Sequence, residues 1–333
     1  MSSSTPIIGL ESISKRFVKP LDVAAKLGRL LGANVREEVV YAVDDVSLQI
    51  MRGEVVGLVG ESGCGKSTLG RVVAGVHEPS DGKVTFRGQD YTTLTGELKR
   101  DAALKVQMIF QDPMSSLNPR LRVADIVGEA PLVHGLIKRS ELDDYLADVL
   151  TRVGLEEGYL RRFPHQFSGG QRQRLGIARA LAVQPEFLVC DESVAALDVS
   201  IQAQVLNLFI KLREDLDLTY LFISHDLGVV EHISDRVVIM YLGRIVEIAP
   251  TEELFAEPNH PYATALLSEV PRLDARKRRF EPVTGEIPSP LDPPSGCHFH
   301  PRCKHAMARC SQEQPKLMEI APHRFSACHL NDS

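Results

Sequence analysis

Residues Gly60–Thr68 read GESGCGKST. The apolar run Val55–Val59 precedes this stretch, and a segment with helical character, Leu69–Ala74, follows it. A strand, a G-x-x-x-x-G-K-[ST] loop and a helix in this order are typical of a phosphate-binding loop. The glycines let backbone N–H groups converge, and the positive end of the helix dipole faces the same point. The sequence therefore predicts a nucleoside triphosphate site formed by Gly60, Glu61, Ser62, Gly63, Cys64, Gly65, Lys66, Ser67 and Thr68.

Four side chains supply the chemistry that such a site needs. Lys66 can reach the β- and γ-phosphates, and the Ser67 hydroxyl can hold Mg²⁺. A second pair, Asp191 and Glu192, follows the apolar run Phe187–Cys190. In a sheet built around a phosphate loop, Asp191 lies beside the Mg²⁺ and Glu192 lies next to the γ-phosphate. A carboxylate at that point can polarise the attacking water, so the pair predicts hydrolysis of the nucleotide.

The composition is that of an ordinary globular protein. The chain has 333 residues, of which 44% are hydrophobic and 25% are charged, enough for one large domain with an appendage or for two domains. The net charge of -6 provides no basic field that would suggest nucleic acid as a partner. No apolar run approaches the ~18 residues of a membrane span, and the first residues lack a secretory signal pattern. We expect the chain in the cytosol unless a membrane partner holds it.

Short apolar segments alternate with helical ones along most of the chain. This order predicts an α/β fold with a mainly parallel sheet that is covered on both faces. Between residues 123 and 153 the apolar positions follow a helical period, which predicts a helical insert that ends near Phe163. The expected strands are 43–50, 83–87, 106–110, 187–190, 220–223, 237–240 and 245–248, and the expected helices are 169–182, 201–212 and 227–233.

A second glycine motif, FSGGQ, begins at Phe167. Ser168 as the N-cap of a helix, followed by Gly169 and Gly170 and then Gln171, exposes hydroxyl and backbone donors at a helix start. One chain cannot use two distant anion-binding surfaces on the same γ-phosphate. A dimer can do so if it places ATP between the phosphate loop of one subunit and the FSGGQ of the other.

With these motifs the chain resembles the ATPase subunits of ABC transporters, whose signature is usually LSGGQ. The resemblance covers about Ile8 to Glu253. It implies ATP and Mg²⁺ as cofactors and a P-loop NTPase fold of the ABC type, with an antiparallel β subdomain and a helical subdomain at about 113–180. Three positions depart from the family: Phe167 replaces the usual leucine, Ser193 the usual proline and Ala195 a frequent serine. The last two departures put the rigidity of the loop and the rate in doubt.

The resemblance also implies roles for residues outside the two glycine motifs. Gln111 matches the glutamine that senses Mg²⁺ and the attacking water and reports to the membrane subunits. Asp198, in the sequence Ala196-Leu197-Asp198, matches the loop that crosses to the opposite nucleotide site. His225 matches the switch histidine on the γ-phosphate, and Tyr41 lies where the family stacks an aromatic ring on adenine. The implied catalytic residues are Lys66, Gln111, Glu192 and His225, and the implied Mg²⁺ ligands are Ser67, Gln111 and Asp191.

Two stretches narrow the resemblance to importers of oligopeptides and dipeptides. They are Gln111–Leu121 (QDPMSSLNPRL) and Asn259–Leu267, with the proline-rich tail that follows. Such importers pair two related ATPase subunits with two membrane permease subunits and an external substrate-binding protein, so the chain is expected at the cytoplasmic face of the inner membrane. Nickel, glutathione or another small solute remains an alternative cargo. A soluble ABC-type switch ATPase is disfavoured because the chain has one core and no coiled coil.

A cysteine cluster marks the last part of the chain, which we divide into an ATPase domain, 1–255, and a C-terminal extension, 256–333. Four thiolates in one short segment suit either tetrahedral zinc or an iron–sulfur cluster. Some ATPases that this chain resembles carry a 4Fe–4S cluster here, and the gaps are longer than those of zinc knuckles, so we favour the cluster over Zn²⁺ and over unliganded thiols. The expected ligands are Cys297, Cys303, Cys310 and Cys328.

Two further segments have charge patterns that can suit a membrane surface. Val23–Leu31 has apolar residues at helical spacing, and we favour a packed helical insertion over an amphipathic membrane helix. Arg276–Arg279 is a run of basic residues that could contact anionic lipid or nucleic acid, and we favour a solvated linker.

Overall fold

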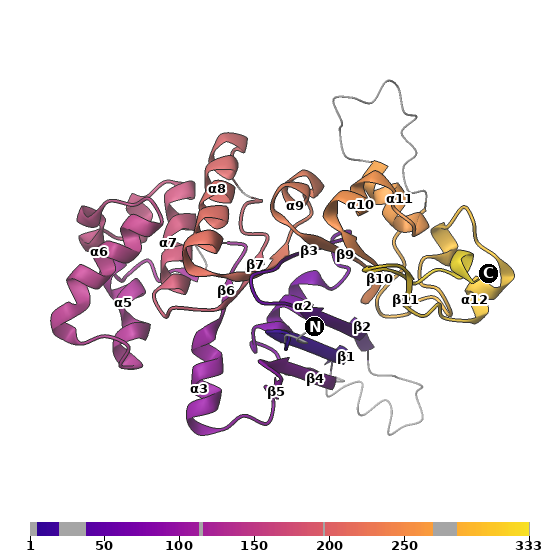
Figure 1. Cartoon of the computed structure of the whole chain (residues 1–333), viewed down its shortest axis with the longest axis horizontal. Coiled ribbons are helices and arrows are strands. Elements are labelled where there is room, and N and C mark those ends of the chain that lie inside the picture. The colour runs from indigo at the N-terminus through magenta and orange to yellow at the C-terminus, as the bar shows by residue number, and fades with distance from the viewer. Residues whose placement is uncertain (1–4, 20–37, 113–115, 196, 269–284, 333) are drawn as a thin grey trace, which may run out of the picture.

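The structure is a computed structural model that describes residues 5–19, 38–112, 116–195, 197–268 and 285–332 (Figure 1). The predicted helix at 23–31, the basic run at 276–279 and Ala196 lie outside the described residues. Within the ranges given above, no helix combines the length and the apolar character needed to cross a bilayer.

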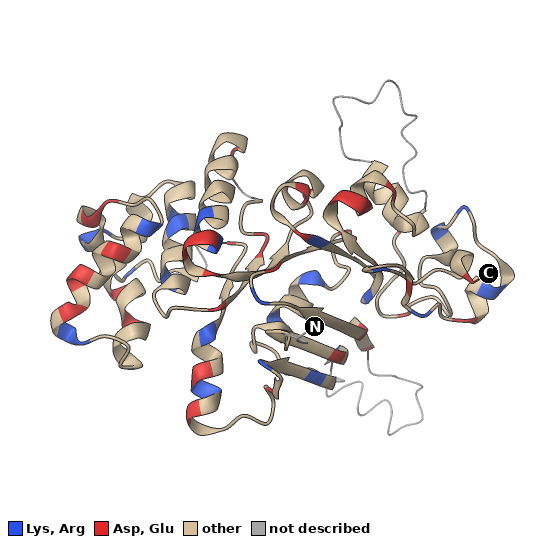
Figure 2. Cartoon of the chain, in the orientation of Figure 1, with Lys and Arg blue, Asp and Glu red and all other residues tan. Residues whose placement is uncertain are grey.

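The main sheet has eight strands in the order β11-β12-β10-β9-β3-β8-β7-β6. Neighbours from β9 to β6 pair in parallel, which confirms the predicted mainly parallel sheet, and the strands beyond β9 pair antiparallel. The central strands β3 and β8 and the edge strand β6 carry no charged residue (Figure 2). The strands are β3 Val55–Val59, β6 Val106–Ile109, β7 Phe187–Asp191, β8 Thr219–Ile223, β9 Arg236–Tyr241, β10 Arg244–Pro250, β11 Met318–Ala321 and β12 Arg324–Ser326.

The two faces of this sheet are buried in separate apolar clusters. Leu188 of β7 and Phe222 of β8 pack with the helical insert, whereas Val189 and Leu221 pack on the opposite face. Successive residues of a strand point to opposite faces, so these fully buried strands need apolar residues at every position. This requirement explains why they appear in the sequence as continuous apolar runs.

A second sheet of four antiparallel strands, in the order β2-β1-β4-β5, packs on one of these faces. Helix α2 shares that core with both sheets, since Leu69 and Val72 of α2 belong to the same cluster as Ile8 of β1 and Leu58 of β3. Figure 1 shows this smaller sheet beside α2. The elements are β1 Ile8–Lys19, β2 Glu38–Ile50, β4 Asp81–Phe86, β5 Gln89–Asp90 and α2 Lys66–Val73.

A helical region is inserted between β6 and β7 and lies at the opposite end of the molecule from the C-terminal segment (Figure 1). The face predicted from periodicity is largely buried, at Leu142, Leu146, Val149 and Leu150. The helices of this region are α5 Val123–Val133, α6 Leu142–Arg152 and α7 Gly169–Leu181, with short 3-10 turns at Arg139–Glu141, Glu157–Arg161 and Pro164–Gln166. The other helices of the ATPase core are α3 Gly96–Lys105, α8 Val199–Leu216 and α9 Leu227–Ile233.

The C-terminal segment is joined to the main sheet. Strand β12 pairs antiparallel with β10, with Ser326 opposite Glu247, and β11 adds a further strand at the edge. Phe299 packs against Tyr241 of β9 and Tyr262 in a third apolar cluster. Helix α10 Thr251–Ala256 leads into this segment, whose helical elements are α11 Pro261–Ser268, η4 His300–Arg302, α12 Ala308–Gln312 and η5 His329–Asn331.

Candidate functional site

The loop Gly60–Thr68 adopts a conformation that requires glycine at two positions. The φ angles of Gly60 and Gly65 are 153° and 107°. A Cβ at Gly60 would lie 2.2 Å from the carbonyl oxygen of Met240, and a Cβ at Gly65 would lie 2.0 Å from that of Ala42. Gly65 is the N-cap of α2 and has no side chain to occupy the first N–H groups of the helix. Those N–H groups therefore remain available to an anion.

Lys66 is buried within this loop. Its side-chain ammonium donates hydrogen bonds to the carbonyl oxygens of Gly60, at 2.7 Å, and Glu61, at 3.0 Å. These neutral acceptors solvate the ammonium but do not balance its charge. A buried cation held in this way favours an anionic ligand, and the lysine of a phosphate loop has that function.

One carboxylate, that of Asp191, contacts the loop at the carboxyl end of β7. Ser67 Oγ donates to Asp191 Oδ1 at 2.8 Å, and Asp191 is 2% exposed. Burial raises the pKa of Asp191, and the hydrogen bond from Ser67 opposes that rise. Hydroxyl and carboxylate oxygens are ligands that Mg²⁺ prefers, so Ser67 and Asp191 fit a Mg²⁺ site.

Glu192 is held by residues from two neighbouring strand ends. Gln111 follows β6, and its Nε2 donates to Glu192 Oε2 at 2.6 Å. His225 follows β8, and its Nδ1 lies 3.4 Å from Glu192 Oε1. Glu192 has a φ of 45°, a strained backbone conformation for a residue other than glycine. The strands β3, β8, β7 and β6 are adjacent and parallel, so their carboxyl ends bring these side chains to one edge of the sheet.

The FSGGQ motif lies in the helical region and makes local hydrogen bonds. Ser168 Oγ accepts from the backbone N–H of Gln171 at 3.3 Å, and Gln171 Oε1 accepts from the backbone N–H of Ser168 at 3.0 Å. This reciprocal pair is a capping box, and it begins α7. Ser168 and Gly169 are exposed, and Gly170 is half-buried. The motif is therefore an accessible helix start rather than part of the site around Lys66.

Two other predicted residues are also at the surface. Asp198 is exposed at the start of α8, and no side-chain hydrogen bond from it caps that helix. Tyr41 of β2 is 37% exposed, and the Arg16 guanidinium lies 5.9 Å from the centre of its ring. Among the residues that the structure describes, no hydrogen bond or ion pair joins Asp198 or Tyr41 to the carboxylates of Asp191 and Glu192.

The four C-terminal cysteines line one small pocket together with His260, His300, His305 and His329. All four thiols are free of disulfide bonds. Burial raises the pKa of Cys297 to about 11 and also raises the pKa of Cys303 and Cys328. Within the described residues, no group of three or more His, Cys, Asp or Glu side chains has the arrangement of a metal site. The predicted gathering of the thiols is therefore observed without the predicted metal geometry.

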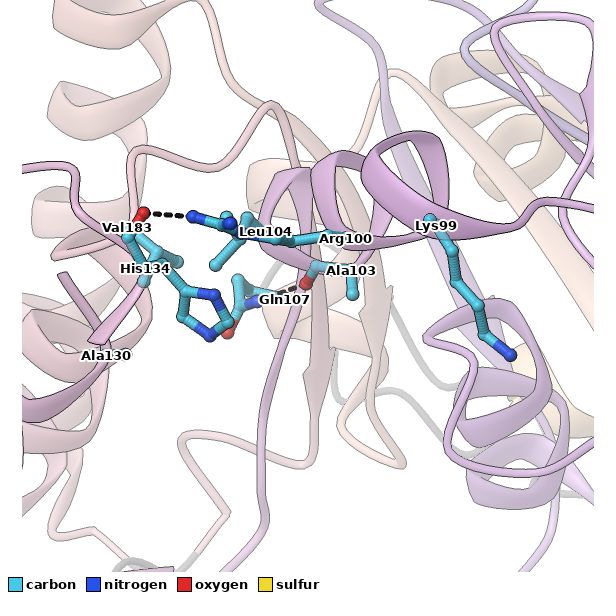
Figure 3. A pocket seen from close by; sticks show the side chains of 9 residues that line it. Lys99, Arg100, Ala103, Leu104, Gln107, Ala130, His134 and Val183 are labelled. Atoms are coloured by element: carbon cyan, nitrogen blue, oxygen red, sulfur yellow. Dashed lines mark hydrogen bonds between the residues drawn. The ribbon is translucent and has the colours of Figure 1, made fainter.

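A separate pocket of about 430 Å³ lies between α3 and α5 (Figure 3). Arg100 of α3 donates to the carbonyl oxygen of His134, which links the two helices across it. Two other residues that line the pocket are also bonded, because Gln107 Nε2 donates to Ala103 O at 2.7 Å. The sequence did not predict this pocket, because its lining residues belong to no motif and come together only in the folded chain.

Comparison with known proteins shows which family has a sequence similar to that of this chain. Residues 43–195 match the ABC transporter family, and residues 246–310 match the oligopeptide/dipeptide transporter C-terminal region. The chain is 50% identical over 295 residues to the oligopeptide transport ATP-binding protein AppF of Bacillus subtilis, covering 87% of this chain and 90% of AppF. The chain belongs to the ABC transporter ATP-binding proteins. As a member, this ABC ATPase binds and hydrolyses ATP.

Other relatives agree with this assignment over nearly the whole length. A putative peptide import ATP-binding protein of Brucella ovis is 46% identical over 327 residues, which cover 98% of each chain. Among solved structures, the dimeric post-hydrolysis state of the ATP-binding cassette MJ0796 with ADP and Pi has a TM-score of 0.61 and 27% identity, over 73% of this chain and 98% of that one. CbiO1 from Clostridium perfringens has the same TM-score at 25% identity, over 76% and 92%. The predicted P-loop NTPase fold of the ABC type is confirmed.

Proposed function

We propose that this ABC ATPase powers the import of dipeptides or oligopeptides through a membrane permease. The observation that carries the proposal is the match to peptide-transport relatives through both the ATPase core and the tail. In this proposal the chain is peripheral to the inner membrane, at its cytoplasmic face, and an external binding protein delivers the peptide. The ATPase itself does not contact the peptide.

The residues around Glu192 support a mechanism for hydrolysis. Lys66 binds the β- and γ-phosphate oxygens, and Ser67, Asp191 and Gln111 hold the metal ion. Mg²⁺, when bound, neutralises charge on the phosphate oxygens. Glu192 orients the attacking water and accepts its proton, because a carboxylate beside the γ-phosphate is the available base. His225 stabilises the γ-phosphate.

The 2.6 Å and 3.4 Å contacts from Gln111 and His225 to the two oxygens of Glu192 support this assignment. They hold the carboxylate from both sides at the edge of the sheet where Asp191 and Ser67 also lie. Gln111 follows β6, just before the helical region, so a change at Glu192 can be transmitted toward α5.

A second ATPase subunit completes each site in this proposal. Ser168, Gly169, Gly170 and Gln171 of one chain contact the ATP held by Gly60–Thr68 of the other, and Asp198 crosses to the same site. The exposure of Ser168, Gly169 and Asp198 supports this arrangement, because residues that serve another subunit must be accessible. A related chain is favoured over a second copy as this partner.

The permease subunits are proposed to contact the pocket between α3 and α5. Exposed apolar side chains lie on both of its helices, at Leu98 of α3, 57% exposed, and Val133 of α5, 73% exposed. The basic residues Lys99 and Arg100 of α3 also line the pocket, and Arg100 reaches across it to the carbonyl oxygen of His134 (Figure 3). A short amphipathic helix with an acidic residue fits this combination of apolar and basic groups.

We propose a 4Fe–4S cluster for the thiols of Cys297, Cys303, Cys310 and Cys328, with Zn²⁺ as the alternative. Their position around one small pocket supports the proposal, because four thiols that line the same pocket can ligate one cluster. Iron and acid-labile sulfide are measured on protein that was purified without oxygen. Four iron atoms per chain support the cluster, and stoichiometric zinc without iron contradicts it.

The transport proposal is tested with the assembled importer in lipid vesicles. ATP hydrolysis is measured with the external binding protein carrying a peptide, nickel or glutathione. We expect stimulation by the peptide-loaded binding protein and none by the others. If only the binding protein loaded with nickel or glutathione stimulates ATP hydrolysis, that solute and not a peptide is the cargo. If the isolated chain hydrolyses ATP at a rate that the membrane subunits do not change, the soluble switch ATPase is favoured.

A further inference from the structure

The C-terminal segment holds one residue of the phosphate loop, Glu61, by its side chain and by its backbone. Arg302 donates from Nη1 to Glu61 Oε2 at 2.7 Å and from Nη2 to Glu61 Oε1 at 2.8 Å. The backbone N–H of Glu61 donates to Tyr262 Oη at 2.9 Å. Arg302 ends η4 and Tyr262 lies in α11, so two elements beyond the ATPase core contact the same loop residue.

Arg302 is fixed in this position by its surroundings. Its side chain is 4% exposed, whereas that of Glu61 is 22% exposed. Arg302 Nη1 also contacts Tyr241 Oη at 3.4 Å, and its guanidinium lies 5.8 Å from the centre of the Tyr241 ring. Phe299 lies 5.3 Å from the rings of both Tyr241 and Tyr262 and packs the segment against β9. A bidentate arginine in such a packed site has one geometry available.

The charge of Glu61 makes this contact relevant to ATP. A carboxylate in the phosphate loop has the same sign as the triphosphate and opposes its binding. Lys66 Nζ already lies 3.0 Å from the carbonyl oxygen of Glu61. A released Glu61 carboxylate would therefore have the Lys66 ammonium close by as an ion-pair partner and would compete with the phosphates for it.

We propose that Arg302 is a positioning residue for ATP, which keeps the Glu61 carboxylate neutralised and away from Lys66, so that the C-terminal segment completes the ATP site of its own chain. This inference rests on the proposed role of Gly60–Thr68 and Lys66 in binding the phosphates. It assigns the segment a function at the nucleotide, separate from any group that its cysteines hold.

The test compares Arg302→Gln, Glu61→Gln and the double variant in the full chain, with MgADP binding measured by calorimetry. Arg302→Gln leaves Glu61 charged and unpaired, and we expect affinity to fall about tenfold. Adding Glu61→Gln removes the competing charge and should restore affinity to within about threefold of the unaltered chain. In the importer, Arg302→Gln should raise KM for ATP about tenfold and change kcat less than about twofold.

The control is Arg309→Gln, in the same segment. Arg309 pairs with Glu313 and Asp332, and its side chain is 51% exposed, so this variant should bind MgADP as the unaltered chain does. Arg302→Lys keeps the positive charge but cannot form the bidentate pair, so it should lose affinity, though less than Arg302→Gln does. If the melting temperature shows that Arg302→Gln is unfolded, Arg302→Lys takes its place in the comparison.

The proposal would be overturned if the double variant bound MgADP as weakly as Arg302→Gln does. That result would mean that Arg302 only supports the structure of the loop, because removing the charge of Glu61 cannot restore lost structural support. Unchanged affinity in Arg302→Gln would overturn the proposal too. Failure of the unaltered chain to bind MgADP, or binding that Lys66→Ala does not weaken, would instead refute the role of the loop.

Discussion

Two helix starts in this ABC ATPase, those of α2 and α7, are built from similar glycine-rich sequence and have different surroundings. At α2, Ser67 donates a hydrogen bond to Asp191 of β7. The next residue, Glu192, accepts a hydrogen bond from Gln111, which follows β6, and lies close to His225, which follows β8. At α7, Ser168 and Gln171 bond to one another, and the motif is exposed.

In the proposed dimer, α2 begins the larger part of each ATP site and α7 of the partner chain supplies the rest. Both helices offer N–H groups and a positive dipole end to an anion. Only the start of α2 has a buried cation, Lys66, and carboxylates that can hold a metal ion and polarise water.

Glu192→Gln should lower ATP hydrolysis at least about 100-fold and leave ATP binding within about threefold, because the amide keeps the shape but cannot accept the proton of water. Steady-state hydrolysis by the importer and nucleotide binding are measured together. Glu214→Gln, on the exposed face of α8, is the matched control and should be unchanged. Near-normal hydrolysis in Glu192→Gln would refute the assignment of this residue.

Lys66→Ala should weaken MgADP binding at least about tenfold, because it removes the buried positive charge from the loop. Calorimetry on the full chain measures this loss. The counterpart at the other helix start, Ser168→Arg, should leave binding by the isolated chain within about twofold. Equal losses in both variants would contradict the division between the two helix starts.

The proton affinity of Asp191 should give MgADP binding a pH dependence that the α7 motif cannot produce. Burial raises the pKa of Asp191, so this carboxyl keeps its proton at a pH where an exposed aspartate has lost it. As the pH falls, protonation of Asp191 should compete with Mg²⁺ and weaken MgADP binding. The comparison with Asp191→Asn, whose remaining pH dependence belongs to the nucleotide, isolates this contribution. An identical profile in both proteins would contradict it.

The sequence predicted the features that depend on local pattern. The phosphate loop, the N-cap at Ser168 and the apolar strands each occupy a few consecutive residues, and their chemistry follows from spacing. The order of the parallel strands then brings Gln111, Glu192 and His225 together. Helix α8 is longer than the predicted 201–212, since its first and last turns lack the apolar periodicity that marked its centre.

Contacts between distant parts of the chain were not predictable in the same way. Arg302 and Glu61 are 241 residues apart, and no spacing rule links them. The tail was expected to be a proline-rich extension, yet its strand β12 joins the main sheet. The sequence did not predict this strand, because strands of three or four residues leave little trace in the sequence. Cysteine spacing suggested a common site, but the positions of the thiols depend on how η4, α12 and η5 pack.

In the proposed dimer, FSGGQ of one ATPase chain completes the phosphate-loop site of another. The most direct test of this claim is sedimentation of the Glu192→Gln chain with and without MgATP, alone and together with the related ATPase chain of the importer. We predict a complex of two ATPase chains that forms only with MgATP and that is lost when Ser168→Arg is added to the chain, while each separate chain still binds ATP. A complex that persists in the Ser168→Arg variant, or chains that stay separate with MgATP in both arrangements, would contradict the claim.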